Sequence, residues 1–373
     1  MHVGVPREIK NHEYRVGLTP TAVAELVLHG HQVSVEHDAG AAIGFSDDDY
    51  RAAGAQLASV EELFKQADMI VKVKEPQAEE RARLQAGQIL FTYLHLAPDP
   101  QQTEDLLNSG AICIAYETVT DARGQLPLLA PMSEVAGRMA IQAGAGCLEK
   151  ARGGRGVLLG GVPGVPRGKV VILGGGVVGS NALAMAVGLG AEVTVLDKSP
   201  EVLRRLDAEY GNRIQTLYST AATLEAQVVA ADLVIGAVLI PGAAAPKLIS
   251  AELVSRMQPG AVLVDVAIDQ GGCAETSRAT THAEPTYVVD QVVHYCVANM
   301  PGAVARTATQ ALNNATLPFV LALANKGVRQ ALEDDPHLLN GLNVSQGKLT
   351  NKGVGEALDR EVQPLALALK SLA

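Results

Sequence analysis

The chain has 373 residues, a length that favours two domains because one hydrophobic core rarely serves more than about 250–300 residues. Its formal net charge of −10 argues against a nucleic acid or an anionic membrane as partner. Its four cysteines lie far apart without a CxxC pair, so we expect a reducing compartment, no disulfide framework and no metal site.

The sequence also argues against a membrane or secretory route. It contains no window of about 18 uninterrupted apolar residues, and it opens on the strand-like segment HVGVP without a charged leader. We therefore expect no signal peptide, no membrane partner and a cytoplasmic location.

The first 118 or so residues alternate short apolar runs with helical patterns. Pro20 suits the first turn of a helix that Gly30 ends, and further helices are expected to begin near Ser46 and Ser59. Strand, helix and strand repeated in this way predict right-handed crossovers and a mainly parallel sheet. The expected strands are HVGVP (2–6), HQVSVEH (31–37), MIVKVKE (69–75), QILFTYLHL (88–96) and AICIAY (111–116).

A second α/β unit follows a long helical stretch at 132–150 and a glycine-rich loop at 153–169. The loop contains only GxxxGK, which is one residue short of a phosphate-binding P-loop. We therefore do not expect a P-loop in this segment. A helix is expected at 307–325, followed by a polar, irregular tail up to VQPLALALK. The expected strands of this unit are VVILG (170–174), EVTVLD (192–197), RIQTLYS (213–219), DLVIGAV (232–238), AVLVDVA (261–267), TYVVD (286–290) and HYCVAN (294–299).

These patterns predict an α/β protein with two Rossmann-like, doubly wound domains and mainly parallel sheets. The dinucleotide-binding domain, 131–306, is expected to be inserted into a substrate domain formed by 1–130 and 307–373.

A glycine turn carries the strongest functional signal of the sequence. Gly174, Gly176 and Gly179 form GxGxxG between the strand VVIL and a helical run, and Asp197 ends the next strand. The glycines permit a tight turn, close approach of a pyrophosphate and helix packing, and the helix N-terminus attracts the phosphates. Asp197 can accept hydrogen bonds from the adenosine ribose and repels a 2′-phosphate, although Lys198 softens that repulsion. The pattern favours NAD over a turn that only closes a βαβ unit.

Polar side chains stand at the ends of several other expected strands. Arg15 follows the first strand, Lys74 lies near the end of MIVKVKE, Tyr93 and His95 close FTYLHL, and Asp269 follows LVDVA. Ligands of open parallel sheets bind beyond the carboxyl ends of strands. If the domains face each other across a cleft, these groups converge on one small ligand.

Each of these residues also has a structural interpretation. Arg15 could pair with a neighbouring glutamate on a surface loop, and Lys74 could be a solvated strand-end lysine. His95 could be a satisfied core histidine, and Asp269 could cap the turn that follows it. Tyr93 is expected to pack, with its hydroxyl pointing at the cleft.

The chemistry of the set favours a dehydrogenase of a small amino or hydroxy acid. Two cations, Arg15 and Lys74, can clamp a carboxylate. His95 can exchange protons near neutral pH, and Asp269 can orient a water or ammonia molecule and stabilise an iminium.

The segments that carry these residues resemble bacterial alanine dehydrogenases over essentially the whole chain. The resemblance implies an enzyme that interconverts L-alanine and pyruvate with NAD, commonly a homohexamer, with an inserted Rossmann domain. The matching segments are GVPREIKNHEYRVGLTP, VKVKEP, FTYLHLA, APMSEVAGRMA, VDVAIDQGGC and HYCVANMPGAV.

The resemblance also implies roles for single residues. Arg15 and Lys74 are expected to bind the substrate carboxylate, and His95 and Asp269 to form the catalytic acid–base pair. We also expect Tyr93 and Asn299 at the substrate. The implied cofactor contacts, beside the glycine turn and Lys198, are Ser133, Val178, Asp197, Ser219, Val238, Leu239, Asn299 and Met300.

Two details stay open at this point. Without the resemblance, Ser133 and Ser219 would be interpreted as helix caps. Relatives often carry a basic residue about five positions after Asp197, where this chain has Val202, so Lys198, Arg204 or Arg205 is a candidate replacement.

Three rival interpretations share the fold. One is the NAD-binding subunit of a transhydrogenase, which needs membrane segments in partner chains and need not retain the substrate residues. A second is a saccharopine dehydrogenase, whose substrate is much longer. A third is a non-catalytic module that senses NAD(H) for a partner protein.

Overall fold

A computed structural model describes residues 1–238 and 245–372, and the chain divides into two compact units. Unit 1 comprises Met1–Pro131 and Val304–Ala373, and unit 2 comprises Met132–Ala303. Unit 2 is therefore inserted in the chain between two parts of unit 1.

Unit 1 contains an eight-stranded sheet in the order β15-β14-β6-β5-β4-β1-β2-β3. Strands β1 to β6 are parallel, with β1 at the point where the winding reverses, and β14 and β15 add an antiparallel edge. The strands are β1 (His2–Val5), β2 (Gln32–Glu36), β3 (Gln56–Ala58), β4 (Met69–Val71), β5 (Ile89–Thr92), β6 (Ile112–Ala115), β14 (Leu342–Ser345) and β15 (Lys348–Leu349).

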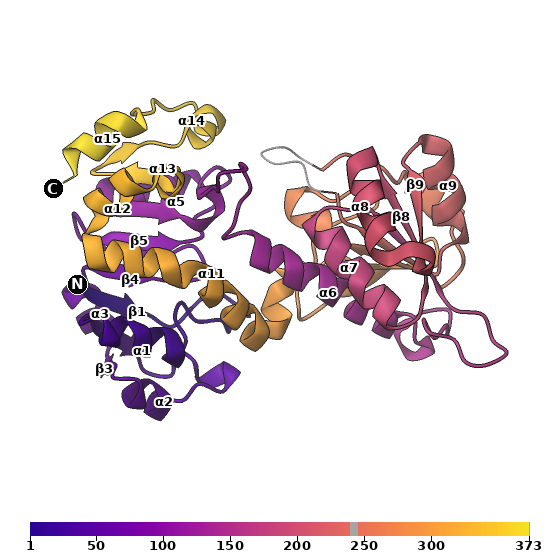
Figure 1. Cartoon of the computed structure of the whole chain (residues 1–373), viewed down its shortest axis with the longest axis horizontal. Coiled ribbons are helices and arrows are strands. Elements are labelled where there is room, and N and C mark those ends of the chain that lie inside the picture. Colours follow the sequence, from indigo (N-terminus) through magenta and orange to yellow (C-terminus); the bar gives the residue numbers. More distant parts are fainter. Residues whose placement is uncertain (239–244, 373) are drawn as a thin grey trace. The chain divides into compact units, whose positions relative to one another are not determined.

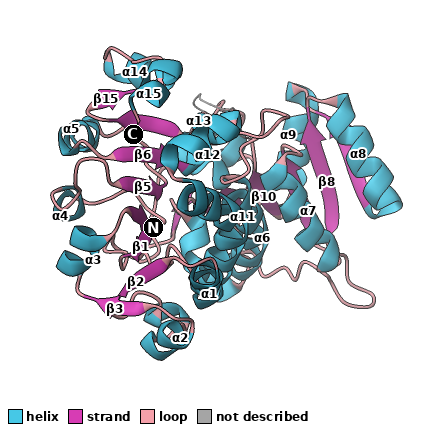
Figure 2. Ribbon diagram, turned by 60° about the vertical axis from the view of Figure 1, so that its left-hand side comes forward, coloured by secondary structure: helices cyan, strands magenta, loops and turns pink. Residues whose placement is uncertain are grey.

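Helices cover both faces of this sheet, which is why strands such as β4, β5 and β6 are buried along their whole length. Figure 2 shows α3, α4 and α5 on one face and α1, α11 and α12 on the other. The helices of unit 1 are α1 (Pro20–Leu28), α2 (Asp47–Ala52), α3 (Val60–Gln66), α4 (Ala78–Arg81), α5 (Pro100–Ser109), α11 (Ala305–Lys326), α12 (Val328–Asp334), α13 (Pro336–Leu339), α14 (Lys352–Leu358) and α15 (Leu365–Ser371), with 3-10 turns η1 (Ala41–Ile43) and η2 (Tyr116–Thr118).

Unit 2 contains a seven-stranded sheet in the order β12-β13-β11-β10-β7-β8-β9, parallel except for β12. Its strands are β7 (Lys169–Leu173), β8 (Glu192–Asp197), β9 (Ile214–Tyr218), β10 (Leu233–Gly236), β11 (Val262–Asp265), β12 (Thr286–Val289) and β13 (Val292–Tyr295). Its helices are α6 (Ala130–Cys147), α7 (Val177–Gly188), α8 (Pro200–Tyr210), α9 (Ala221–Ala230) and α10 (Ala251–Ser255), with 3-10 turns η3 (Lys150–Arg152), η4 (Gly211–Arg213), η5 (Val266–Gln270) and η6 (Met300–Val304).

Both sheets follow the doubly wound order in which the first strand, β1 or β7, separates the strands wound in the two directions. The predicted fold class is therefore confirmed. The expected helix starts are also confirmed, because Thr19 caps α1 ahead of Pro20 and serine capping boxes begin α2 at Ser46 and α3 at Ser59.

The predicted irregular tail is wrong. Residues 328–358 form α12 to α14 and the antiparallel pair β14–β15. Strand β14 pairs with β6 of the first segment, with Leu342 opposite Ile114. A four-residue strand whose partner lies more than two hundred residues earlier leaves only a weak local pattern.

The second segment of unit 1 returns to the first through α11, drawn in orange beside the strands of the same sheet in Figure 1. Asn313 on this helix is buried, and its Oδ1 accepts from the backbone N–H of Thr19 at 2.7 Å. Its Nδ2 donates to the carbonyl of Gly17 at 2.8 Å. One amide therefore satisfies two backbone groups of the segment that precedes α1.

We expect Asn313→Ala to lower the free energy of unfolding by about 3 kcal/mol, because each buried backbone group left without a partner costs roughly 1–3 kcal/mol. Urea unfolding followed by circular dichroism measures the change. The matched control is Asn314→Ala, one residue along on the exposed side of the same helix. Equal losses in the two variants would contradict the assignment.

Candidate active site

The predicted substrate residues of unit 1 follow three neighbouring strands. Arg15 lies in the segment after β1, Lys74 follows β4, and Tyr93 and His95 follow β5. These strands are adjacent in the order β1-β4-β5 and parallel, so their carboxyl ends meet at one edge of the sheet. The winding reverses at this edge, which is where doubly wound folds bind ligands.

Arg15 is buried and held by its neighbour Glu13. Its Nε donates to Glu13 Oε1 at 2.7 Å, and its NH2 group donates to Oε2 at 2.6 Å. Burial works to lower the pKa of Arg15, but the hydrogen bonds and charge of Glu13 outweigh it and raise that pKa. The sequence also allowed Arg15 to pair with a glutamate on a surface loop. The ion pair with Glu13 exists, but both side chains are buried.

A buried ionic cluster lies beneath the start of the Lys74 segment. Lys72 is fully buried, and its Nζ donates to Glu8 Oε2 at 3.1 Å and to Glu80 Oε1 at 2.6 Å. The other oxygen of Glu8 accepts from the backbone N–H groups of Val73 at 2.7 Å and Lys74 at 3.3 Å. Sequence reasoning missed this cluster, although the alternation VKVKE places two lysines on the strand end.

Lys74 itself is not a fully solvated lysine. Its side chain is 15% exposed, and its Nζ lies 3.9 Å from Glu75 Oε2. The lysine therefore sits in a largely enclosed position just past β4.

Tyr93 and His95 form a stacked pair just beyond β5, which ends earlier than predicted, at Thr92. The two rings are 5.9 Å apart between centroids and 8° from parallel. The Tyr93 hydroxyl donates to the carbonyl of Leu128 at 2.5 Å. Burial raises the pKa of Tyr93 above its ordinary value, which keeps that donor protonated.

His95 is an exposed residue and not a core histidine. Its backbone has φ +51°, in the left-handed region that residues with a side chain adopt at a cost. Asn299 in unit 2, another predicted site residue, has φ +59°. Such conformations cluster at functional sites, because a binding or reacting side chain is held where an ordinary turn would not place it.

The predicted site residues of unit 2, which are cofactor contacts apart from the catalytic candidate Asp269, also follow strand ends. The glycine turn follows β7, Asp197 ends β8, Ser219 follows β9, Val238 follows β10, Asp269 follows β11, and Asn299 and Met300 follow β13. Leu239 lies outside the described residues. Ser133 lies inside α6, and Thr220, not Ser219, caps α9, so the alternative that these serines are helix caps is wrong.

The glycine turn has the geometry that each position of GxGxxG requires. Gly174 has φ +98°. A Cβ on Gly179 would stand 1.8 Å from the carbonyl oxygen of Gly174, so only glycine lets α7 pack this closely. A Cβ on Gly176 would meet nothing within 4 Å. Gly176 also caps α7 without a side-chain bond, so the first N–H groups of the helix face open space suited to a pyrophosphate.

Asp197 is fixed against the same turn. Its Oδ2 accepts from the backbone N–H of Gly175 at 2.7 Å, and its Oδ1 accepts from that of Ser199 at 2.7 Å. Of the basic candidates near Val202, Arg205 reaches the turn, because its NH2 group donates to the carbonyl of Gly175 at 3.0 Å. Lys198 is exposed.

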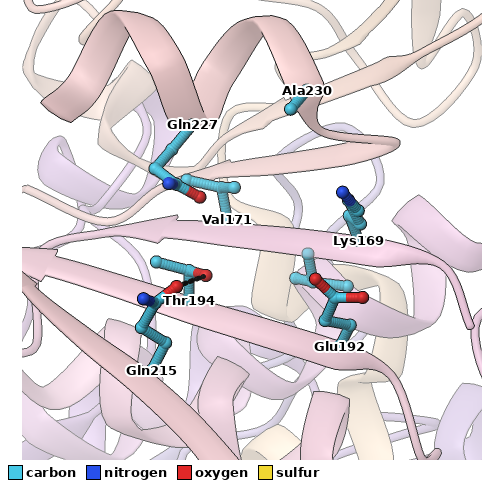
Figure 3. Close-up of a pocket in the computed structure, with 8 residues that line it drawn as sticks. Lys169, Val171, Glu192, Thr194, Gln215, Gln227 and Ala230 are labelled. Carbon is cyan, nitrogen blue, oxygen red and sulfur yellow. Dashed lines mark hydrogen bonds between the residues drawn. The ribbon is translucent and has the colours of Figure 1, made fainter. Parts of the chain in front are cut away.

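A cavity of about 570 Å³ lies beside the carboxyl ends of β8 and β9 and is lined in part by Lys198, Ser219 and Leu224. Its volume is in the usual range for small-molecule sites, about 300–1,000 Å³. A second cavity, of about 170 Å³, lies toward the amino ends of β7 to β9 among Lys169, Glu192 and Gln215 (Figure 3). The glycine turn is at the opposite ends of these strands, so the second cavity is separate from the candidate site.

Asp269 lies exposed in η5, and its Oδ1 accepts from the backbone N–H of Asn299 at 3.4 Å. The turn after η5 is held by a different residue. The buried Asp265 accepts through Oδ2 from the Cys273 N–H at 2.8 Å and from the Ser277 hydroxyl at 2.6 Å. Asp265 therefore holds the two ends of this segment, through the N–H groups of Ala267 and Cys273.

Within residues 1–238 and 245–372, no group of three or more His, Cys, Asp or Glu side chains is arranged to hold a metal ion. No helix in that same part is long and apolar enough to cross a membrane.

Comparisons with known proteins agree with this geometry. The profile of the alanine dehydrogenase/PNT N-terminal domain matches residues 4–136, and the profile of the C-terminal domain matches residues 140–352. An alanine dehydrogenase of Halomonas elongata is 66% identical over 97% of this chain and 98% of its own length. One of Methanococcus maripaludis is 56% identical over 99% of this chain and 100% of its own.

Solved structures show the same relationship. A structure of an L-alanine dehydrogenase has a TM-score of 0.94 at 54% identity, covering 96% of this chain and 99% of that one. A transhydrogenase structure from Sinorhizobium meliloti has a TM-score of 0.81 at 25% identity, covering 94% and 99%.

The two ends of the glycine turn should respond differently to an added methyl group. We expect Gly179→Ala to lower the free energy of unfolding by several kcal/mol, on the order of the cost of overpacking a core. Gly176→Ala should unfold within about 1 kcal/mol of the wild type yet bind NADH roughly tenfold more weakly, since the methyl group occupies the open approach to the turn. Urea unfolding and NADH fluorescence titration separate the two. Wild-type NADH affinity in Gly176→Ala would contradict the assignment.

The Lys72 cluster predicts a stability that depends on pH. Burial raises the pKa of Glu8 above its ordinary value, and Lys72 opposes that rise. Replacing Lys72 by Met leaves two buried carboxyls without their cation, which costs about 3–5 kcal/mol. A carboxyl whose folded pKa lies above its unfolded pKa stabilises the fold at low pH and loses that contribution as pH rises through the folded pKa.

The free energy of unfolding that Lys72→Met loses relative to the wild type should therefore be smaller at pH 5 than at pH 8. Urea midpoints of both proteins across this range measure it, with the exposed Lys65→Met as control. A loss that is constant with pH would count against a Glu8 carboxyl whose pKa is raised by burial.

Proposed function

The chain belongs to the alanine dehydrogenase/PNT family, and we propose that it catalyses the reversible NAD-dependent oxidative deamination of L-alanine to pyruvate and ammonium. The observation that carries the proposal is the strand-end set of unit 1, with Arg15, Lys74 and His95 all retained at the edge where the winding reverses. High identity to alanine dehydrogenases along nearly the whole chain supports it.

We assign the cofactor to the edge of unit 2 that carries the glycine turn. The pyrophosphate fits the open approach at Gly176 and the uncapped start of α7, and Asp197 is already turned onto the glycine turn to accept from the adenosine ribose. The cavity beside Ser219 has room for the adenine. When bound, NAD supplies the acceptor for the hydride that leaves Cα of alanine.

Substrate binding falls to two cations of unit 1. Arg15 presents a guanidinium that burial and Glu13 hold in one place, and Lys74 adds a second positive charge from the neighbouring strand end. Together they bind the carboxylate of alanine or pyruvate. The Tyr93 ring supports the adjacent imidazole through stacking.

Proton transfer belongs to His95 and Asp269. Once the amino group of alanine has lost a proton, loss of hydride from Cα leaves the protonated imine of pyruvate, and the Asp269 carboxylate is proposed to stabilise this cation. His95 or Asp269 removes a proton from the water that attacks the imine carbon, which gives a carbinolamine. A proton then returns to the nitrogen, the hydroxyl loses its proton as the C–N bond breaks, and pyruvate and ammonia result, the ammonia leaving as ammonium. The residues proposed to bind the substrate carboxylate thus lie in unit 1, and those proposed to bind the cofactor lie in unit 2.

The family resemblance further supports a homohexamer that works in the cytoplasm. The transhydrogenase alternative remains distinguishable by activity, since a subunit that only binds NAD(H) does not consume alanine. Alanine-dependent NADH formation, followed by absorbance and repeated with serine, glycine and lactate, tests the proposal. Absence of turnover with alanine, in a protein that binds NADH, would overturn it in favour of a binding module or a transhydrogenase subunit.

We expect His95→Ala to lower kcat by roughly 10²–10⁴-fold, the usual contribution of a general acid–base group, because the carbinolamine steps lose their proton carrier. NADH affinity should change by less than about twofold, since the residue belongs to unit 1. Steady-state assays in both directions and NADH fluorescence measure the two effects. The surface residue His29 provides the control variant His29→Ala. Wild-type turnover in His95→Ala would remove His95 from the mechanism.

A further inference from the structure

The turn after β5 is an unusual way to present a functional side chain. His95 has its backbone in the left-handed region at φ +51°, directly after the buried residue Leu94. A residue with a side chain adopts this conformation at a cost in free energy, so surrounding groups must stabilise the turn. The interactions that hold this turn therefore decide where the imidazole stands.

Glu117 supplies the main restraint on the turn. It lies in η2, directly after β6, which pairs with β5 and places Ala115 opposite Thr92. Its carboxylate accepts from the backbone N–H of His95 at 2.7 Å and from that of Leu94 at 3.1 and 3.2 Å. One carboxylate thus binds two successive N–H groups of the strained turn.

The remaining contacts fix the turn without touching the imidazole nitrogens. The amide of Gln102 donates to the carbonyl of Leu94, and the Tyr93 ring lies parallel to the His95 ring. Among the residues that the structure describes, none forms a hydrogen bond with the imidazole nitrogens of His95, so they are directed by backbone and stacking contacts alone.

We propose that Glu117 is a positioning residue for His95, holding the turn in the one conformation that presents the imidazole to the substrate. The inference rests on the proposed function, in which His95 carries protons. A carboxylate suits this task because it only accepts, and its charge strengthens both bonds to the N–H groups. A glutamine in its place offers one accepting oxygen and an NH₂ group that cannot bond an N–H donor.

The test is a pair of variants assayed for pyruvate amination. We expect Glu117→Gln to lower kcat about tenfold and Glu117→Ala about 100-fold, since a displacement near 1 Å of a reacting group costs up to about 10²-fold. KM for pyruvate should stay within about threefold, because Arg15 and Lys74 extend from β1 and β4. NADH affinity, measured by fluorescence, should not change.

Asp68→Asn is the matched control, because Asp68 Oδ2 also accepts a backbone N–H, that of His2 at 2.7 Å, far from the carboxyl ends of the strands. Its kcat should equal that of the wild type. A kcat within threefold of the wild type in both Glu117 variants would overturn the proposal. So would a loss of NADH binding or of cooperative unfolding in both, which would make Glu117 a residue of the fold alone.

Failure of the proposed function gives a different result. In that case the wild type itself does not aminate pyruvate, whereas failure of the Glu117 assignment leaves an active wild type with equally active variants.

Discussion

The reversal of winding direction beside β1 and beside β7 is the constraint on which the rest of the structure depends. Neighbouring parallel strands wound in opposite directions carry their connecting helices to opposite faces, so the loops beyond their carboxyl ends diverge and leave one edge open. Arg15, Lys74 and His95 follow the strands at this point in unit 1. In unit 2 the glycine turn and Asp269 follow β7 and β11. The residues proposed for substrate and for cofactor thus follow the same topology, which occurs twice in one chain.

Strand ends alone do not fix side chains, and in this protein buried or half-buried carboxylates do so by binding backbone N–H groups. Glu8 binds the N–H groups at Lys74, Glu117 those at His95, Asp265 those of the turn after Asp269, and Asp197 that of Gly175. Each carboxylate comes from a neighbouring strand or segment. Because ionised acceptors bind N–H groups about twice as strongly as neutral ones, such contacts hold turns that are otherwise strained.

How much of this could be predicted follows from the range of the interactions. Strands, capped helices and the glycine turn follow from local patterns, and the spacing of GxGxxG and Asp197 predicts a cofactor site at one edge of the second sheet. The carboxylate contacts are different, because Glu8 and Lys74 are 66 residues apart and nothing near either one signals the other. The same limit hid strand β14 and the hydrogen bond from the Tyr93 hydroxyl to the carbonyl of Leu128, 35 residues later.

The buried charges of unit 1 show what this arrangement costs. Lys72 with Glu8 and Glu80, and Arg15 with Glu13, lie almost wholly out of water, where an apolar set of the same volume is often as stable or more so. Their contribution to stability therefore does not explain why these charges are buried. Their positions explain it, because Arg15 is proposed to bind the substrate and Glu8 joins Lys72 to the backbone of Lys74. A cation that burial and a carboxylate hold in one rotamer needs little reorganisation when a small carboxylate arrives, which is the condition for holding a substrate as small as alanine at reacting distance.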